Sequence, residues 1–449
     1  MKSTLLIALA IIVFTTCSIV SAQPQNVVVI SGATVIDSTY HDPIGDAVIV
    51  IEGNRIKQVG AKNRIKPPKN AQMIDSHGKF VIPGLADMHQ HLGNGYFLRG
   101  QGGPQDAQQN LAQMLAWGFT TIFSPGSSNF TSLKALANKD DSPMPRFFGT
   151  GRVITVKDGH GSAPVFHSYL PDTPGEARAN VREMKMAGGD AIKFIYDDGA
   201  RDGRKPVPMM KPEVMQTIID EAHKLGLKAY AHATNLQQAK EVLRAGGDGL
   251  AHAIVSEPVD DEFIGLMKRN RALYITTHSL FNGLADIAAW MQRLEALDER
   301  GIVPKEVYER FKNPEGVNSY YSIFGKFNPA RLQYLKTNLR KVFDAGILVV
   351  AGTDTGVPGV LLGISSQMEL VLLVEDGLKP AEVLGTATLN AAKMLGREKY
   401  QGTVEEGKFA DLSILDADPF ADISNIRRIH RVIKAGVVYD PANLLRTTR

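Results

Sequence analysis

The chain has 449 residues, a formal net charge of +3 and an ordinary globular composition with 44% hydrophobic residues. This length suits one large domain and a smaller one. Lysine and arginine are scattered along the chain, which argues against a nucleic-acid-binding protein. The only cysteine, Cys17, lies close to the N-terminus. The chain beyond it can form no disulfide and must hold any metal with histidine, carboxylate or modified lysine.

Residues 1–22 are typical of a secretory signal peptide. Lys2 is the only charged residue, Leu5 to Phe14 are nearly all apolar, and the segment ends in small residues. The apolar run is too short to span a membrane. We therefore expect cleavage before Gln23 and an exported protein, periplasmic or secreted, with no membrane span in the mature chain. An uncleaved anchor or a lipid anchor at Cys17 is the alternative.

Both ends of the mature chain are rich in β-branched residues separated by turn residues. The candidate strands there are residues 26–30, 47–51, 55–59, 411–415 and 429–439. We predict one small β-sandwich domain formed from both chain ends, comprising residues 23–84 and 397–449.

The middle of the chain, residues 85–396, alternates strand and helix patterns. Candidate strands lie at residues 85–91, 119–124, 146–154, 190–196, 227–233, 248–254, 272–277 and 347–353. This alternation predicts an α/β fold of the (β/α)8 TIM-barrel type. A doubly wound open sheet is the rival, but no glycine-rich phosphate loop follows the first strand. Residues 279–329 are too long for a simple connection and predict a helical insertion, which could form a lid.

His89 and His91 form a His-x-His pair at the end of the first of these strands. Residues two apart on a strand point to the same side, so the pair directs two imidazoles into one space, as a metal ion requires. Taken alone, the pair is equally compatible with two polar residues on a half-exposed strand.

Four more residues with metal-binding chemistry occur at or near later strand ends. They are Lys193, His232, His252 and Asp354. Each alone has an ordinary explanation, such as a core histidine, a turn aspartate or a buried ion pair. Barrel strands direct their C-terminal ends to one shared mouth, so the six residues are expected to converge.

With these residues in place, the chain resembles the amidohydrolase superfamily, in particular the branch related to imidazolonepropionase and to Xaa-Pro and Xaa-Arg dipeptidases. The resemblance covers nearly all of the mature chain. Besides the six residues, it includes the stretch at residues 389–396 and the return segment at residues 402–412.

The resemblance implies a binuclear metal site. His89, His91 and Asp354 would bind the inner of two divalent ions, and His232 and His252 the outer one. Lys193, carrying carbon dioxide as a carbamate, would bridge them, because an ammonium repels cations whereas a carbamate is an anion with two oxygens. Zinc is the expected metal, and manganese, cobalt or iron would also suit this donor set.

The implied activity is that of a metal-dependent amidohydrolase, cleaving an amide bond of a small molecule by attack of a metal-bridged hydroxide. A dipeptide or an N-acyl amino acid is the preferred substrate. A cyclic amide, imidazolone or lactone is the alternative, and a catalytically dead exported binding protein is a third. The expected mature protein has no nucleic-acid partner, and association into a homo-oligomer is left open.

Four residues at the barrel mouth receive roles in catalysis or substrate binding. Asp354 is expected to take the proton of the hydroxide and pass it to the leaving amine. His278, closing the seventh strand, is a second catalytic candidate. Tyr230 and His160 are substrate-binding candidates, with packing as the alternative for Tyr230.

Overall fold

The computed structural model describes residues 27–39, 41–91, 104–127, 130–164, 167–200, 205–357 and 359–447. The predicted signal peptide, residues 1–22, lies outside these ranges. Within the described ranges, every helix is too short or too polar to cross a membrane.

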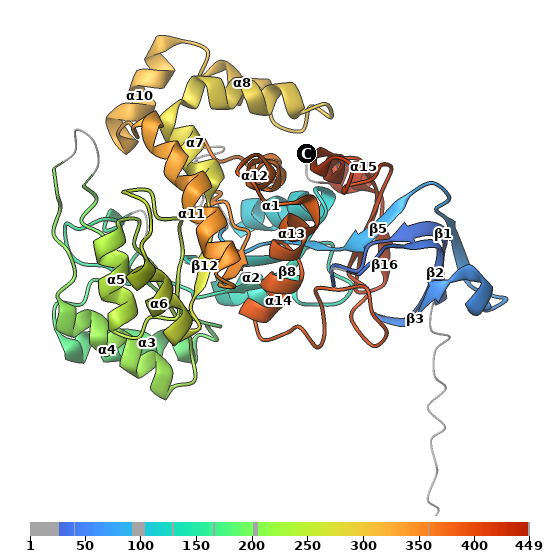
Figure 1. Ribbon diagram of the computed structural model, residues 1–449, viewed down its shortest axis with the longest axis horizontal. Coiled ribbons are helices and arrows are strands. Elements are labelled where there is room, and N and C mark those ends of the chain that lie inside the picture. The colour runs from blue at the N-terminus through green and yellow to red at the C-terminus, as the bar shows by residue number, and fades with distance from the viewer. Residues whose placement is uncertain are drawn as a thin grey trace, which may run out of the picture.

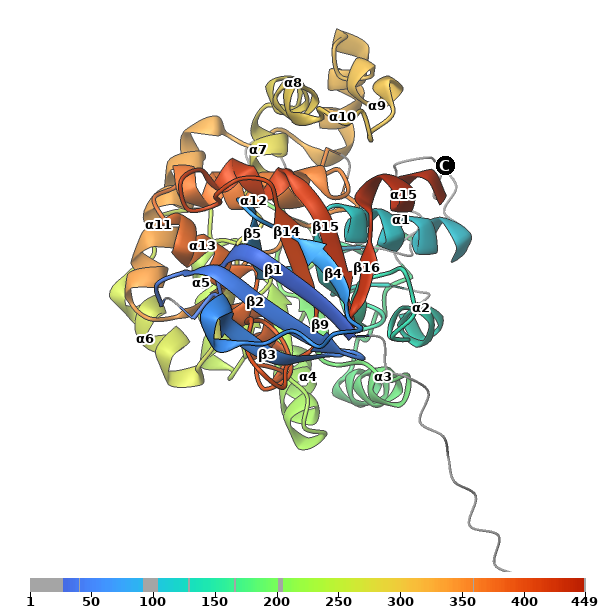
Figure 2. The same cartoon turned by 90° about the vertical axis from the view of Figure 1, so that its right-hand side faces the viewer.

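A mixed sheet of eight strands is built from both ends of the chain, and it faces the viewer in Figure 2. Its path is β16-β15-β14-β5-β1-β2-β3, and β4 pairs with β1. Valine and isoleucine at alternating positions of these strands form a separate buried core, as expected for a half-buried sheet. The strands are β1 (Val27–Val35), β2 (Ile44–Glu52), β3 (Arg55–Ala61), β4 (Gln72–Asp75), β5 (Phe80–Pro83), β14 (Leu412–Leu415), β15 (Ile429–Lys434) and β16 (Val437–Tyr439).

Each of the eight strand segments predicted in the middle of the chain contains a strand. They form two parallel sheets, β6-β7-β8 and β9-β10-β11-β12-β13. Their bounds are β6 (Leu85–Asp87), β7 (Phe119–Ser124), β8 (Arg146–Gly149), β9 (Ile192–Ile195), β10 (Ala229–His232), β11 (Gly249–Leu250), β12 (Leu273–Ile275) and β13 (Leu348–Val350). The prediction of an α/β fold with parallel strands is confirmed.

Backbone hydrogen bonds join the two parallel sheets at both edges. Ile154, which follows β8, donates to the carbonyl of Lys193 in β9 at 3.0 Å. At the other edge, Met88 donates to Ala351 at 3.0 Å, and Asp354 donates to His89 at 2.8 Å. The second edge therefore places the end of the first parallel strand directly beside the end of the last one.

Most helices alternate with the parallel strands along the chain and pack their apolar faces into the largest buried core. Sequence signals set several of their ends: Thr173 and Glu176 form a capping box at the start of α3, and Gly188 follows its end with φ +83°. These helices are α1 (Pro104–Ala116), α2 (Phe130–Ala137), α3 (Pro174–Met186), α4 (Pro212–Lys224), α5 (Leu236–Arg244), α6 (Asp261–Asn270), α11 (Leu332–Asp344), α12 (Ile364–Glu375) and α13 (Pro380–Thr386). α14 (Leu389–Met394) instead contributes to the buried cluster that contains Tyr230, and α15 (Pro441–Thr447), at the C-terminal end, packs against α1 and β15.

The long connection after β12 is helical, as predicted. It contains α7 (His278–Ala285), α8 (Ile287–Leu297), α9 (Lys305–Glu309) and α10 (Pro314–Phe324), and α8 and α10 stand at the top of Figure 1, away from the mixed sheet. The indole of Trp290 in α8 donates a hydrogen bond to the carbonyl of Gly359 at 2.7 Å. The insertion is therefore attached to the segment that follows β13 and Asp354.

Candidate metal centre

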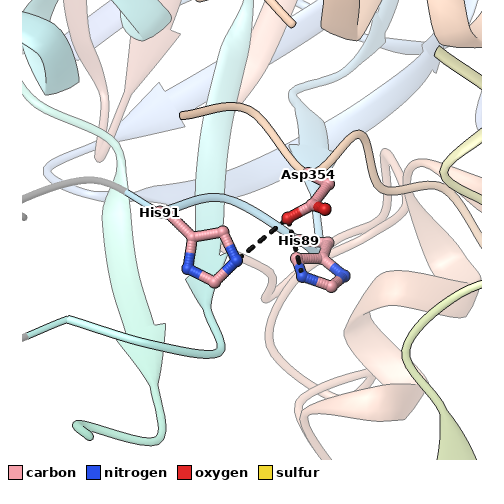
Figure 3. Close-up of side chains that lie close together, drawn as sticks. All are labelled: His89, His91 and Asp354. Carbon is pink, nitrogen blue, oxygen red and sulfur yellow. Dashed lines mark ion pairs between the residues drawn. The ribbon is translucent and has the colours of Figure 1, made fainter. Parts of the chain in front are cut away.

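His89, His91 and Asp354 meet where β6 and β13 end (Figure 3). The Nε2 atoms of His89 and His91 lie 3.2 and 2.9 Å from Oδ1 of Asp354. The backbone hydrogen bonds between the two strand ends produce this meeting of residues more than 260 positions apart. Asp354 adopts a left-handed backbone conformation with φ +66°, a strained state that is concentrated at functional sites.

The orientation of His89 shows that this group suits a cation. Its Nδ1 lies 2.8 Å from the carbonyl oxygen of Ala251, which can only accept, so Nδ1 carries the proton. Burial lowers the pKa of His89 to about 4, so the ring is neutral and its Nε2 offers a lone pair. This Nε2 and Oδ1 of Asp354 are buried without a hydrogen-bond partner among the described residues. Two acceptors facing each other in a buried site repel unless a positive ion lies between them.

Asp87, which was not among the predicted residues, holds both strand ends of this group. Its carboxylate accepts backbone hydrogen bonds from His89 at 3.1 Å and Thr353 at 3.2 Å. The side chains of Gln90, Thr353 and Ser366 also donate to it. Asp87 therefore positions the residues on either side of the metal-binding group. The only sequence signal was its place two residues before His89.

A second group with metal-binding chemistry comprises His160, Asp197 and His232. Nε2 of His232, the last residue of β10, lies 3.3 Å from Oδ2 of Asp197. Nδ1 of His160 lies 3.6 Å from Oδ1 of Asp197. His160 and His232 were predicted from the sequence, whereas Asp197 was not. The available signal was its position two residues after β9.

His252 connects the two groups. Its ring centroid lies 4.6 Å from that of His89 and 4.3 Å from that of His232. Its Nδ1 is 3.1 Å from the hydroxyl of Thr277. Buried Glu369 of α12 accepts hydrogen bonds from the hydroxyl of Thr276 and the backbone N–H groups of the two residues after Thr277, at 2.6 to 2.8 Å. Glu369 thereby fixes the turn that orients His252.

Lys193 lies in β9, beside Tyr230 in the adjacent strand. Its side chain is buried, and burial lowers the pKa of its amine to about 8, against the opposing effect of the Asp354 charge. A neutral fraction of the amine is therefore available near neutral pH, which is the form that reacts with carbon dioxide.

The neighbours of two further candidates, Tyr230 and His278, are now defined. Tyr230 packs in an apolar cluster with residues from most of the parallel strands, 6.2 Å from the ring of Phe123, which matches the packing alternative. His278 does not close a strand, because β12 ends at Ile275 and His278 begins α7. Its Nδ1 lies 2.6 Å from Asp376. Neither residue takes part in the mechanism proposed below.

Gly352, two residues after β13, lies against the backbone of His89. A Cβ at this position would be 2.6 Å from the side chain of Ile275 and 3.0 Å from the backbone nitrogen of His89. Gly352→Ala is therefore expected to lower the free energy of unfolding by about 1–3 kcal/mol and to weaken metal binding. Urea unfolding and metal titration measure the two effects. Gly265→Ala in α6, where the added methyl meets nothing, is the control, and equal behaviour of the two variants would contradict the steric argument.

Comparisons with known proteins agree with this geometry. The family model "Amidohydrolase family" matches residues 80–439. Ochratoxinase of Aspergillus niger is 25% identical, covering 85% of this chain and 80% of the relative, and imidazolonepropionase of Treponema denticola is 24% identical, covering 82% and 85%. The structure of a Xaa-Pro dipeptidase with bound methionine in the active site superimposes with a TM-score of 0.71 at 25% identity, covering 92% of this chain and all of the other. The chain therefore belongs to the amidohydrolase family, and it is an enzyme of the class that hydrolyses amide bonds.

Proposed function

We propose that this hydrolase cleaves the amide bond of a dipeptide or an N-acyl amino acid with the help of two divalent metal ions. The observation that carries the proposal is the pair of buried acceptors, Nε2 of His89 and Oδ1 of Asp354, that face each other without a hydrogen bond. The dipeptide preference rests on the similarity to a Xaa-Pro dipeptidase. A cyclic amide or lactone is the second candidate, supported by the similarity to an imidazolonepropionase and to dihydroorotases.

Six residues would hold the ions in this proposal. His89, His91 and Asp354 would bind the inner ion, His232 and His252 the outer ion, and Lys193 would bridge them as a carbamate. The lowered pKa of Lys193, about 8, supports carbamate formation. Four imidazoles with oxygen donors suit zinc, and the family's use of divalent metals agrees with this set.

When bound, such ions lower the pKa of a water molecule and polarise a scissile carbonyl. The protein groups supply positioning and proton transfer. Asp354 would bind the inner ion through Oδ1. Its other carboxylate oxygen would accept the proton released by the attacking water and donate it to the nitrogen of the leaving amine. Asp87 and Glu369 would keep the strand ends of His89, Asp354 and His252 in place during this transfer.

We further propose that the two parallel sheets close into a (β/α)8 barrel at residues 85–396 and that the terminal segments, 23–84 and 397–449, form a β-sandwich domain. The hydrogen bonds at both sheet edges and the separate core of the mixed sheet support this. The apolar N-terminal segment supports export, to the periplasm or the medium, after removal of residues 1–22.

Metal counting on the purified protein tests the bridge. Lys193→Ala is expected to lose both ions, from two per chain to fewer than about 0.2, because the bridging anion is missing. Lys228→Ala, which removes an exposed lysine paired with Asp248, should keep both ions. Full metal content in Lys193→Ala would reject the carbamate.

A substrate panel tests the reaction itself. Dipeptides, N-acyl amino acids, cyclic amides and lactones would each be offered with added zinc, and again with a chelator. Chelator-sensitive release of an amine from the first two classes is the expected result. Hydrolysis of cyclic substrates alone would favour the second candidate, and no hydrolysis of any class would favour a binding protein.

A further inference from the structure

Thr277, two residues after the end of β12, has a strained backbone. It adopts φ +52° and ψ +36°, in the left-handed region, and it is fully buried. Among the residues that the structure describes, it is the only β-branched one with a positive φ. For a side chain branched at Cβ this conformation is a genuine outlier, and it persists only where the surrounding contacts enforce it.

Backbone hydrogen bonds fix the turn at Thr277 from two sides. Its N–H donates to the carbonyl of Gly352 at 2.9 Å, and the carbonyl of the preceding residue accepts from the N–H of Ala253 at 3.2 Å. Gly352 lies two residues before Asp354, and Ala253 directly follows His252. The turn therefore lies between the two strand ends that carry residues of both proposed ion sites.

Helix α12 holds the same turn at two points. Buried Glu369 accepts hydrogen bonds from the side chain of the residue before Thr277 and from the two backbone N–H groups after it, at 2.6 to 2.8 Å. Directly after the end of α12, the carboxylate of Asp376 accepts a hydrogen bond from Nδ1 of His278 at 2.6 Å. These contacts supply the enforcement that the strained conformation of Thr277 needs.

The side chain of Thr277 reaches a proposed metal ligand. Its Oγ1 lies 3.1 Å from Nδ1 of His252, a residue that is 1% exposed. Because the hydroxyl occupies Nδ1, Nε2 is the nitrogen left to bind an ion. An ion at Nε2 requires the ring's proton to be on Nδ1, and a buried N–H needs an acceptor. Oγ1 of Thr277 is in place to be that acceptor, as the partner of a metal-binding histidine usually is.

We propose that Thr277 is a positioning residue for the outer divalent ion. Its strained backbone, held by α12, brings its hydroxyl to Nδ1 of His252 and thereby fixes the ring with Nε2 toward the ion. This inference rests on the proposed function, because it concerns a ligand of an ion that the function requires. It also gives the strain a purpose, since the left-handed backbone is what directs the hydroxyl at the ring.

The matched variants are Thr277→Val and Thr277→Ser. Valine keeps the branching at Cβ and removes the hydroxyl, whereas serine keeps the hydroxyl and removes a methyl group. Thr217→Val is the control, because it removes a hydroxyl that donates to a helical carbonyl of α4 at 2.7 Å. Metal content and zinc affinity would be measured on the full-length purified protein by elemental analysis and chelator competition. The visible spectrum of the cobalt-loaded protein would report the coordination of each ion independently of turnover.

Thr277→Val is expected to keep the inner ion and to bind the outer one about 10–100-fold more weakly, as for other lost hydrogen bonds to metal-binding histidines. Only one ion's cobalt bands should change in this variant. Thr277→Ser and Thr217→Val should bind both ions as the wild type does. Circular dichroism would show that the variants are folded.

A double-mutant cycle tests the part of α12. Glu369→Gln is expected to weaken the outer ion as well, because the turn is no longer held by a carboxylate. Combined with Thr277→Val, it should add little to the loss from Thr277→Val alone, since both substitutions act on the same ring. Losses that add in full would contradict the inference that α12 acts through Thr277.

Two further results would overturn the proposal. Wild-type affinity for both ions in Thr277→Val would show that the hydroxyl does not act on His252. Equal weakening of both ions in Thr277→Val, repeated in Thr277→Ser, would show that the turn only maintains the fold of the whole centre. Failure of the proposed function is distinct from either result, because it would appear in the wild-type protein as an absence of bound ions or of hydrolysis.

Discussion

Asp354→Asn is expected to lower kcat by about 10³-fold or more, in line with the loss of a positioned general base and acid. Asparagine keeps the size of the side chain and one oxygen that can contact the inner ion, but it cannot accept and return a proton at neutral pH. It also tolerates the left-handed backbone at this position, φ +66°, as aspartate does. The variant should therefore fold and retain much of its metal while turnover is lost.

The test of Asp354→Asn is whether the variant keeps its bound metal while it loses turnover. Metal content, KM and kcat would be measured together, with Asp344→Asn on the exposed side of α11 as the control. Turnover within about tenfold of wild type, at full metal content, would contradict the proton-transfer role of Asp354.

The metal-free protein is expected to lose about 5 kcal/mol of stability between pH 6.5 and pH 4.5 from two histidines alone, because each contributes about 1.4 kcal/mol per pH unit. Burial lowers the pKa of His89 to about 4 and that of His232 to about 3. In the unfolded chain these histidines titrate near 6.5, so the unfolded state binds more protons in this range. Stability therefore falls as pH falls below 6.5.

Urea unfolding of chelator-treated protein at several pH values measures this slope. Burial also lowers the pKa of His252 well below its usual value, so it adds to the same loss. His232→Asn removes one titrating group and should lower the slope by about 1.4 kcal/mol per pH unit, whereas His167→Asn at an exposed position should leave the slope unchanged. Asp87, whose pKa burial raises to about 6, opposes this loss in wild type and variant alike. Equal slopes for the wild type and His232→Asn would therefore show that His232 is not buried and neutral.

Local sequence patterns were sufficient to locate the secondary structure that carries the site. The eight predicted strand segments and the helices between them occur where β-branched runs and amphipathic repeats placed them. For example, α3 begins at the capping box of Thr173 and Glu176, and it ends just before Gly188, which adopts a left-handed backbone conformation. These features depend on near neighbours in the chain, so they are encoded locally.

Residue types at strand ends were likewise sufficient to propose His89, His91, Lys193, His232, His252 and Asp354 as one group. That step needed only the rule that parallel strands share an orientation. The partners of these residues were beyond reach, because Asp87, Asp197 and Glu369 act through contacts with segments up to 279 positions away.

The sequence by itself therefore determined the alternation of strands and helices, the kind of chemistry and the residues able to perform it. Only the tertiary structure decided which nitrogen of His89 faces Asp354 and that Asp197 lies beside His160 and His232. It also decided that Tyr230 packs near Phe123 and that His278 lies beside Asp376. The physical reason is that side-chain direction at a strand end depends on the register between strands and on the conformation of the loop that follows. Both are set by packing across the whole fold.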